Sequence, residues 1–328
     1  MFLYMNKYLT SIQLITEKFL TWRNIRKYRK YEKQKNKNPV LDWVEAFLWA
    51  AMVVLLINQY LFQAYQIPSG SMMNTLLVKD RIFVNKIIYG PELMPGIMKI
   101  PGFFSPKRGE VIIFESPTYL SNGPVFDIAQ RIIYMLTLSL IDIDKDQNGN
   151  PKAHFLIKRA VGVGNDRIRN INGNLQIKPK GLSSWIDESE FKHLDRAVTP
   201  VRRLITDEDY NLYLKAARAS VYSYHNLEVS SEDAQALKNI NSVYADSITF
   251  NEYRSKIEYS MQPHNLSVRK IWRKYETGWY IPEGWIFPLG DNRDNSRDGR
   301  YFGPVRMKKV LGKAMIKYWP PGRFGSIK

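Results

Sequence analysis

The sequence contains no cysteine, and this absence excludes several kinds of chemistry. Disulfides, thiolate zinc sites and a cysteine nucleophile all require a thiol. Histidine is scarce too, since the chain holds only His154, His193, His225 and His264. A mechanism built on a histidine cluster therefore has few candidates.

Negative charge is also in short supply. The 31 Asp and Glu residues are outnumbered by 48 Lys and Arg residues, which gives a net charge of +17. Such a charge suits a nucleic-acid binder or a protein that lies on anionic lipid. The chain has 328 residues, of which 45% are apolar and 24% charged. These values exclude wholesale disorder and a polytopic membrane protein.

One long apolar stretch is present, at residues 44–62. It holds a single acid, Glu45, and about 20 apolar residues are enough to cross a bilayer core. A buried core helix is the alternative, but the stretch has no polar face, and aromatic side chains stand near both of its ends. If the stretch were a secretory leader cut after Ala64, Phe62 would stand at −3, where small residues are required. We therefore expect an uncleaved membrane anchor.

The charge on either side of this stretch predicts its orientation. Residues 1–40 carry ten Lys and Arg against two Glu. Eight of these cations lie in residues 21–40, whereas residues 63–82 carry only Lys79 and Arg81. The positive-inside rule then places the N-terminus in the cytoplasm and the chain after about residue 63 outside.

A serine follows the anchor closely, in Pro68-Ser69-Gly70-Ser71. Proline fixes φ and glycine permits positive φ, so the chain can turn sharply and expose a hydroxyl beside its own N–H group. Acyl transfer needs such a nucleophile with an oxyanion donor. A plain turn is the alternative reading of so short a motif.

A serine nucleophile needs a base, and Lys158 is a candidate. It stands in the apolar run of residues 155–163, which is typical of a buried strand. Burial can neutralise a lysine amine and so allow it to accept a proton. A lysine at a strand edge, with its ammonium in water, fits the run equally well.

A third segment, residues 290–304, alternates acids, Arg, Asn and Gly. This composition predicts a loop rich in hydrogen bonds. Arginines at 293, 297 and 300 break the ligand spacing of a calcium loop. A surface turn remains the alternative.

Together these segments resemble the bacterial type I signal peptidases, or leader peptidases. The matching stretches are QIPSGSMM at 66–73, PKRGEVIIF at 106–114, LIKRAVGV at 156–163 and GDNRDNSRDGRYFGPV at 290–305. Their order and the preceding anchor match as well. The resemblance implies hydrolysis of signal peptides from exported precursors at the outer surface of the membrane.

The resemblance also implies a role for each matching residue. Ser71 would be the nucleophile, and Lys158, as a neutral amine, the general base. The Ser69 hydroxyl and the Ser71 N–H group would form the oxyanion hole. Supporting roles would fall to Ser296, which orients the amine, to Gly290, which leaves room, and to the pairs Arg159–Asp291 and Asp298–Arg300. Small substrate side chains at −1 and −3 would lie among Ile67, Pro68, Met72, Leu76, Ile82, Leu156 and Ile157.

The chain departs from the family pattern at three places. Asn74 stands where proline is usual after Ser-Met-Met, Gly164-Asn165 replaces the usual Pro-Gly, and Gly299 replaces a serine. None of these changes removes a catalytic group, but each bears on the shape of the pocket or the rigidity of a loop.

The implied fold is mainly β, with the antiparallel sheets of the signal-peptidase core, a helix-rich insertion and an N-terminal transmembrane helix. The expected divisions are a basic cytoplasmic arm (1–40), the anchor (41–64), the catalytic core (65–178 and 279–328) and the insertion (179–278). Within the insertion, Thr206 and Ser230 are helix caps, with helices to about residues 223 and 243 and a third over 249–261. Residues 126–141 have helical spacing and are too short to span a bilayer. They form an inserted element that is a candidate second interfacial element.

Three functions compete at this stage. The first is a membrane-anchored Ser/Lys endopeptidase of the bacterial cytoplasmic membrane, whose catalytic domain faces outward. The second is a catalytically altered relative that binds precursors or assists secretion, and the third is a membrane-tethered polyanion binder. For the first we expect no metal or other cofactor and no nucleic acid. Its partners would be precursor proteins and membrane phospholipid, and the resemblance also allows contact with the protein-translocation machinery.

Overall fold

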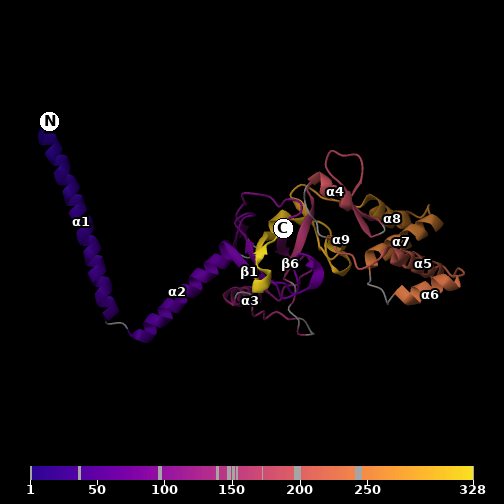
Figure 1. Ribbon diagram of the computed structural model, residues 1–328, viewed down its shortest axis with the longest axis horizontal. Coiled ribbons are helices and arrows are strands. Elements are labelled where there is room, and N and C mark those ends of the chain that lie inside the picture. Colours follow the sequence, from indigo (N-terminus) through magenta and orange to yellow (C-terminus); the bar gives the residue numbers. More distant parts are fainter. Residues whose placement is uncertain are drawn as a thin grey trace. The chain divides into compact units, whose positions relative to one another are not determined.

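The computed structural model describes residues 2–35, 38–94, 98–137, 140–145, 149, 152, 154–171, 173–195, 201–240 and 246–327. The chain forms two compact units, Met1–Val54 and Leu55–Lys328 (Figure 1). The first unit is helical. It contains α1 (Phe2–Lys35) and most of α2 (Pro39–Tyr60). Among the described helices, α2 is the one that is long and apolar enough to cross a membrane. The expected anchor is thus helical, and it ends at Tyr60, shortly before the first strand.

The second unit is built around an antiparallel sheet in the order β1-β2-β13-β5-β6-β11-β12, with β14 paired to β13. The strands are β1 (Phe62–Gln66), β2 (Arg81–Asn85), β5 (Val111–Glu115), β6 (Phe155–Val163), β11 (Trp285–Leu289), β12 (Val305–Arg306), β13 (Val310–Trp319) and β14 (Gly325–Ser326). In β2 the side chains alternate between the core and the other face, with Ile82 and Val84 fully buried. The expected antiparallel β core is confirmed.

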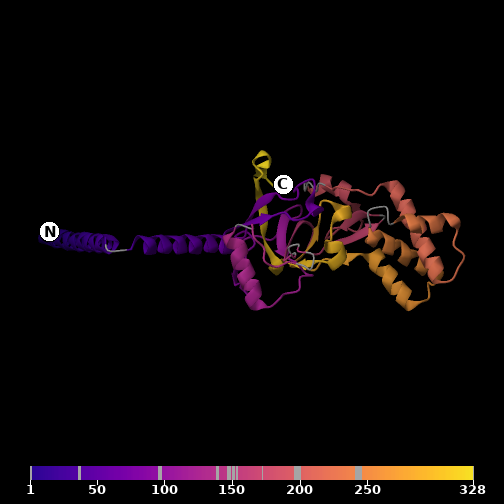
Figure 2. The same cartoon turned by 90° about the horizontal axis from the view of Figure 1, so that it is seen from below.

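Two smaller sheets accompany this core. One has the order β10-β7-β8-β9 and is formed by β7 (Arg167–Ile171), β8 (Asn174–Lys178), β9 (Ile186–Asp187) and β10 (Trp279–Tyr280). The other is a hairpin of β3 (Glu92–Met94) and β4 (Met98–Lys99). A separate helix, α3 (Pro124–Leu136), lies along the core on a different side from the helices of the insertion (Figure 2). The expected helix over residues 126–141 is therefore present but shorter.

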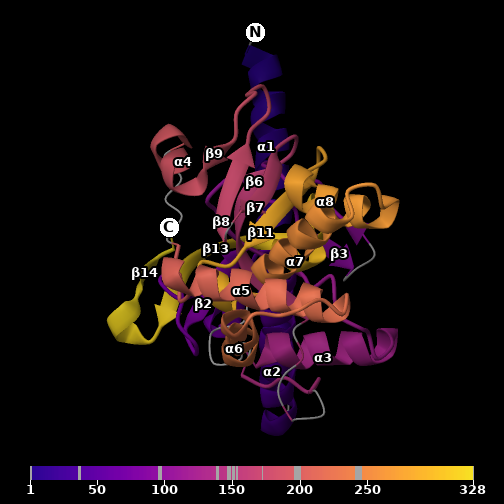
Figure 3. The ribbon, with the colours of Figure 1, turned by 90° about the vertical axis from the view of Figure 1, so that its right-hand side faces the viewer.

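The insertion is helical, as the caps predict. It contains α4 (Glu188–Asp195), α5 (Asp207–Tyr224), α6 (Ser231–Asn239), α7 (Ser247–Met261) and α8 (Leu266–Thr277). Helix α7 lies beside both α5 and α8 (Figure 3). Thr206 caps α5 in a capping box with Asp209, and the Ser230 side chain accepts from the Asp233 N–H group. The helix expected to reach residue 243 ends at Asn239, and residue 243 lies outside the described residues.

One helix, α8, was not anticipated. No residue of α8 is buried, so its sequence shows only a weak pattern of core-facing apolar side chains. Its ends are marked in the sequence nonetheless, since Asn265 accepts from the N–H groups of Ser267 and Val268 and Gly278 follows its last residue. The capping residues were therefore the signal available for α8.

Candidate active site

Ser71 lies in the middle of a single 3-10 turn, η1 (Gly70–Met72), that follows β1. Ser69 enters the turn in an extended conformation, and the Met73 N–H group closes it on the Gly70 carbonyl at 3.1 Å. The turn leaves the Ser71 side chain 8% exposed. The Ser69 hydroxyl lies 3.4 Å from the Ser71 Oγ atom. The two serines of the motif are thus held side by side.

Lys158 projects from β6 directly onto this serine. Its Nζ atom donates to the Ser71 Oγ atom at 2.6 Å and to the Ile157 carbonyl at 3.1 Å. Lys158 pairs with Ile112 of β5 in the sheet register and is 3% exposed. The alternative of a lysine whose ammonium reaches water is therefore wrong for this structure.

Burial lowers the pKa of the Lys158 amine to about 8. The carboxylates of Asp298 and Asp291 oppose this shift, because a negative charge favours the protonated amine, and the Arg300 guanidinium reinforces it. The neutral fraction of Lys158 near physiological pH is thus much larger than that of an ordinary lysine, although the protonated form still predominates. A neutral amine 2.6 Å from a hydroxyl can accept its proton.

The burial of this amine should reduce stability, and Lys158→Met tests this. A shift from 10.5 to about 8 corresponds to at most about 3 kcal/mol. Lys158→Met should raise the melting temperature, and the whole of this gain should be present below pH 8, where the folded wild type carries the buried charge. The gain should shrink as the pH rises from about 8 to 10.5, since the amine is then neutral in the folded state. Thermal melts of both proteins across this range measure the difference, and a gain that does not vary with pH would contradict the assignment.

A loop residue that sequence reasoning missed holds the turn that contains Ser71. The Asn292 N–H group donates to the Ser71 carbonyl at 3.0 Å, and the Asn292 Nδ2 atom donates to the Gly70 carbonyl at 3.0 Å. The loop after β11 therefore fixes the backbone on both sides of the Gly70–Ser71 peptide. The signal available was its position in the 290–304 segment.

The pair Arg159–Asp291 is present and buried on both sides. The Arg159 Nε and Nη2 atoms each donate to the Asp291 carboxylate at 2.8 Å, and the two side chains are 0% and 1% exposed. Thr75, also missed from the sequence, donates to Asp291 at 2.5 Å and accepts from Arg159 at 2.9 Å. These contacts join β6, the loop and the segment after Ser71.

The pair Asp298–Arg300 is also present. The Arg300 Nε atom lies 2.9 Å from Asp298, which accepts in addition from the Gly290 N–H group at 3.0 Å. A Cβ atom at Gly290 would lie 2.2 Å from the Ser296 Oγ atom and 2.6 Å from the Ser71 carbonyl oxygen. Gly290 therefore leaves room for Ser296 and for the turn that contains Ser71.

The Ser296 hydroxyl is buried beside the Asp298 carboxylate and helps to lower the pKa of that group. The expected bond from Ser296 to the Lys158 amine is not formed among the described residues.

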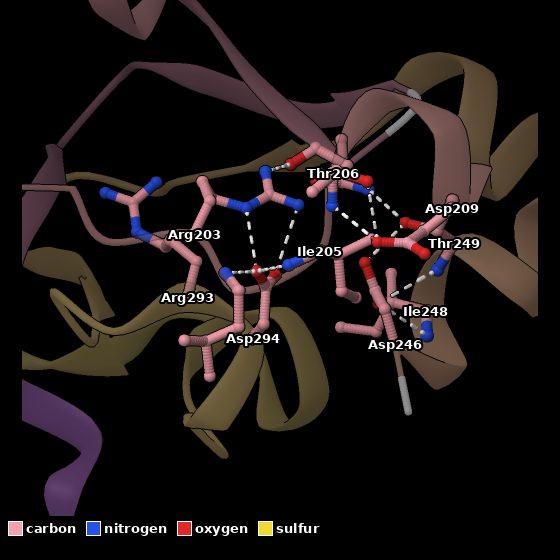
Figure 4. A network of polar contacts seen from close by, with 12 residues as sticks. Arg203, Ile205, Thr206, Asp209, Asp246, Ile248, Thr249, Arg293 and Asp294 are labelled. Atoms are coloured by element: carbon pink, nitrogen blue, oxygen red, sulfur yellow. Dashed lines mark hydrogen bonds and ion pairs between the residues drawn. The ribbon is translucent and has the colours of Figure 1, made fainter. Parts of the chain in front are cut away.

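The insertion is connected to the loop of residues 290–304 through hydrogen bonds and an ion pair of Asp294 (Figure 4). The Asp294 carboxylate accepts from Arg203 and from the N–H groups of Leu204 and Ile205, at 3.1, 2.6 and 3.0 Å. Arg293 forms a buried ion pair with Glu188 at the start of α4. The segment that leads into α5 and the start of α4 thus fix the loop as well.

A pocket of about 350 Å³ has walls from the segments just before Ser71 and just before Lys158, although neither of these two residues lines it. Its lining includes Ile67, Pro68 and Ile157 from the predicted substrate residues. Three others, Met72, Leu76 and Ile82, are core residues with at most 1% exposure, and Leu156 packs against a different apolar cluster from Ile157. The structure therefore brings three of the seven together at this pocket. Among the described residues, no group of three His, Asp or Glu side chains gathers to hold a metal ion.

The departures from the family pattern have local structural reasons. Asn74 and Asn165 have φ values of +96° and +73°. Proline cannot adopt a positive φ, whereas asparagine tolerates it, which suits Asn74 to its position. At residue 165 asparagine tolerates the positive φ that the glycine usual there adopts freely. A Cβ atom at Gly299 would lie 2.8 Å from the Pro288 carbonyl oxygen, so a serine there would require the backbone to shift.

Comparison with known proteins agrees with this geometry. The family model described as "Signal peptidase, peptidase S26" matches residues 40–319. Signal peptidase I of Buchnera aphidicola subsp. Acyrthosiphon pisum is 27% identical over 93% of this chain and 83% of its own length. Signal peptidase I of Haemophilus influenzae is 30% identical over 89% of this chain and 76% of its own length. The Pseudomonas aeruginosa protein of that name is 26% identical, over 89% and 78% of the two chains.

Proposed function

Because the chain belongs to the signal peptidase family, peptidase S26, we propose that it removes signal peptides from exported precursors with Ser71 as nucleophile and neutral Lys158 as general base. The observation that carries the proposal is the 2.6 Å contact between the Lys158 Nζ and Ser71 Oγ atoms, made between two buried side chains. The lowered pKa of Lys158 supports it, since a charged amine cannot take a proton.

The proposed reaction has two halves. Lys158 takes the Ser71 proton as Oγ attacks the scissile carbonyl, and the Ser71 N–H group and Ser69 hydroxyl stabilise the oxyanion. The resulting ammonium gives its proton to the departing amine, which leaves the signal peptide as an ester on Ser71. Lys158 then activates a water that hydrolyses the ester and restores the hydroxyl.

Ser296 is proposed to orient the amine during this cycle. Its hydroxyl is buried beside Asp298, and Gly290 leaves the space that it occupies. When Lys158 transfers its hydrogen bond away from Ser71, the Ser296 oxygen is available to accept one. The ion pairs Arg159–Asp291 and Asp298–Arg300 support this contact by holding the loop of residues 290–304 in place.

The precursor is proposed to bind as an extended strand. β1 is at the edge of the sheet, and in the described pairings β11 joins β6 from Arg159 onward, which leaves residues 155–158 open on that side. Both open edges border the 350 Å³ pocket. A peptide strand can hydrogen-bond to such edges while its alternate side chains enter the pocket.

The proposed location is the bacterial cytoplasmic membrane, with the catalytic unit outside. The cations before α2 favour a cytoplasmic N-terminus. Ser71 follows the end of α2 by eleven residues, which reach at most about 40 Å when fully extended. The nucleophile therefore acts close to the bilayer surface, among phospholipid and near the site where the translocation machinery releases precursors.

The direct test is cleavage of a radiolabelled precursor by the purified full chain in proteoliposomes. We expect the mature protein and the signal peptide as products, and no product with Ser71→Ala. Binding of the precursor without cleavage would instead support the second candidate, a catalytically altered relative. That candidate is favoured only by the departures at Asn74, Gly164-Asn165 and Gly299.

None of the histidines should be required for this chemistry. His154 is engaged by Asp144 at 2.7 Å and stacks on Tyr119. Replacing His154, His193, His225 or His264 singly with Gln should change kcat by less than about tenfold, below the contribution of a general base. A loss of about a hundredfold at any one of them would point to a histidine base instead.

A further inference from the structure

Helix α3 has its polar and apolar sides inverted. The residues of α3 that are exposed are apolar: Val125 (82%), Ile128 (53%), Ile132 (42%) and Leu136 (41%), with Ala129 between them. Spacings of three and four place these side chains on one stripe of the helix. A helix on the surface of a soluble protein shows the opposite arrangement, with its apolar stripe against the core.

The polar side chains of α3 point inward and form hydrogen bonds or ion pairs there. Gln130, 2% exposed, donates to Asp142 at 2.8 Å. Arg131 pairs with Glu92 and Glu115 at 3.4 and 3.3 Å. Asp127 accepts from Ser121 at 2.6 Å. These contacts fix the rotation of the helix, so the apolar stripe cannot turn toward the core.

The inner contacts also connect α3 to the end of α2. The Glu92 side chain that pairs with Arg131 belongs to β3, and the Glu92 carbonyl accepts from the Gln59 Nε2 atom at 2.8 Å. Gln59 lies in the last turn of α2 and in the same compact unit as α3. Tyr60 donates to the carbonyl of Leu93, the next residue of β3. α3 is thus tied to the point where the candidate span leaves the bilayer.

We infer that the outer face of α3, formed by Val125, Ile128, Ile132 and Leu136, docks on the lipid bilayer. Because this apolar stripe is held near the end of the candidate membrane span, the surface closest to it is that of the acyl chains and lipid headgroups. Residues 41–328 carry a net charge of +9, which is what remains of +17 after the +8 of residues 1–40, and this charge adds attraction to anionic lipid. The hairpin that holds Glu92 continues into Phe103 and Phe104, which are 80% and 65% exposed and extend the apolar surface of this unit.

This docking has a consequence for the pocket beside Ser71. The inner face of α3 contributes Gln130 and Tyr134 to the pocket wall, and Tyr134 packs against Tyr65 with ring centroids 6.1 Å apart. One helix therefore has the bilayer on its outer side and the pocket on its inner side. The pocket is thereby held at the membrane surface.

The absence of cysteine allows a direct test in the full chain. Ile128→Cys is labelled with bimane, and the protein is reconstituted in vesicles of phosphatidylethanolamine and phosphatidylglycerol with or without brominated acyl chains. The matched control is Leu266→Cys, an equally apolar position on α8 that is 71% exposed. We expect a blue-shifted emission at residue 128 that loses most of its intensity in brominated vesicles, and an unshifted, unquenched emission at residue 266.

Two results would overturn the inference. A blue shift at residue 128 without bromine quenching would mean that a protein, such as a second copy of the chain, covers the face. An unshifted emission would mean that the face lies in water. Ile132→Cys serves as the second reporter if Ile128→Cys fails to fold, and none of these readings requires catalysis.

Discussion

Lys158→Arg should eliminate cleavage, with a loss in kcat/KM of at least about a thousandfold, the scale seen when a catalytic base is removed. Arginine keeps the positive charge but does not release its proton in proteins, so it cannot take the Ser71 proton. Lys158→Ala should be equally inactive, because the proposed catalysis depends on the neutral amine and not on the positive charge. Steady-state cleavage of a peptide that spans a signal-peptide junction measures all three proteins.

The pH dependence of kcat/KM in the wild type should report the titration of the same Lys158 amine. Below about pH 8 the Lys158 amine is protonated and cannot act as a base, whereas above that value it is neutral. We therefore expect kcat/KM to rise along an acid limb with an apparent pKa near 8. Persistence of this limb in Lys158→Ala would mean that the base lies elsewhere.

The chain offers a matched control in Lys86. This second lysine is also 3% exposed, and burial lowers its pKa to about 7. Its Nζ atom contacts the Gln59 carbonyl at 3.4 Å. Lys86→Arg should keep both the activity and the acid limb. Substantial activity in Lys158→Arg, or loss of the limb in Lys86→Arg, would contradict the proposed dyad.

Asp291→Ala should lower the free energy of unfolding by about 3–5 kcal/mol, the cost of leaving one partner of a buried ion pair unpaired. It removes both carboxylate contacts of Arg159, which is 0% exposed, and the partner of Thr75. Because Asn292 follows Asp291 directly and holds the Ser71 turn, activity should fall as well. Urea unfolding followed by tryptophan fluorescence measures the change.

Two comparisons separate the ion pair from a general weakening of the loop. Arg159→Met with Asp291→Leu removes both charges and should recover much of the stability lost in the single variant. Glu232→Ala breaks the exposed pair with Lys215 and should leave unfolding unchanged. If Asp291→Ala unfolds like the wild type, the buried pair contributes no stability.

The sequence by itself determined the parts of this protein that depend on local chemistry. The apolar stretch of residues 44–62 predicts α2, because about twenty apolar residues are helical in a bilayer and need no partner. Thr206 and Ser230 predict the starts of α5 and α6, since a cap acts on the next three residues. The four ordered motifs identify Ser71 and Lys158 through resemblance to the family, which composition alone does not do.

Only the tertiary structure decided how these parts meet. Whether Lys158 reaches water or Ser71 depends on the pairing of β6 with β5 and on a turn 87 residues earlier, and nothing local encodes that contact. Thr75 and Asn292 became recognisable as supports only when the loop and the turn were brought together. Hydrophobic periodicity predicted α3, but it states only that the helix has two faces. The contacts of Gln130 and Arg131 with the core decided that the apolar face is the outer one.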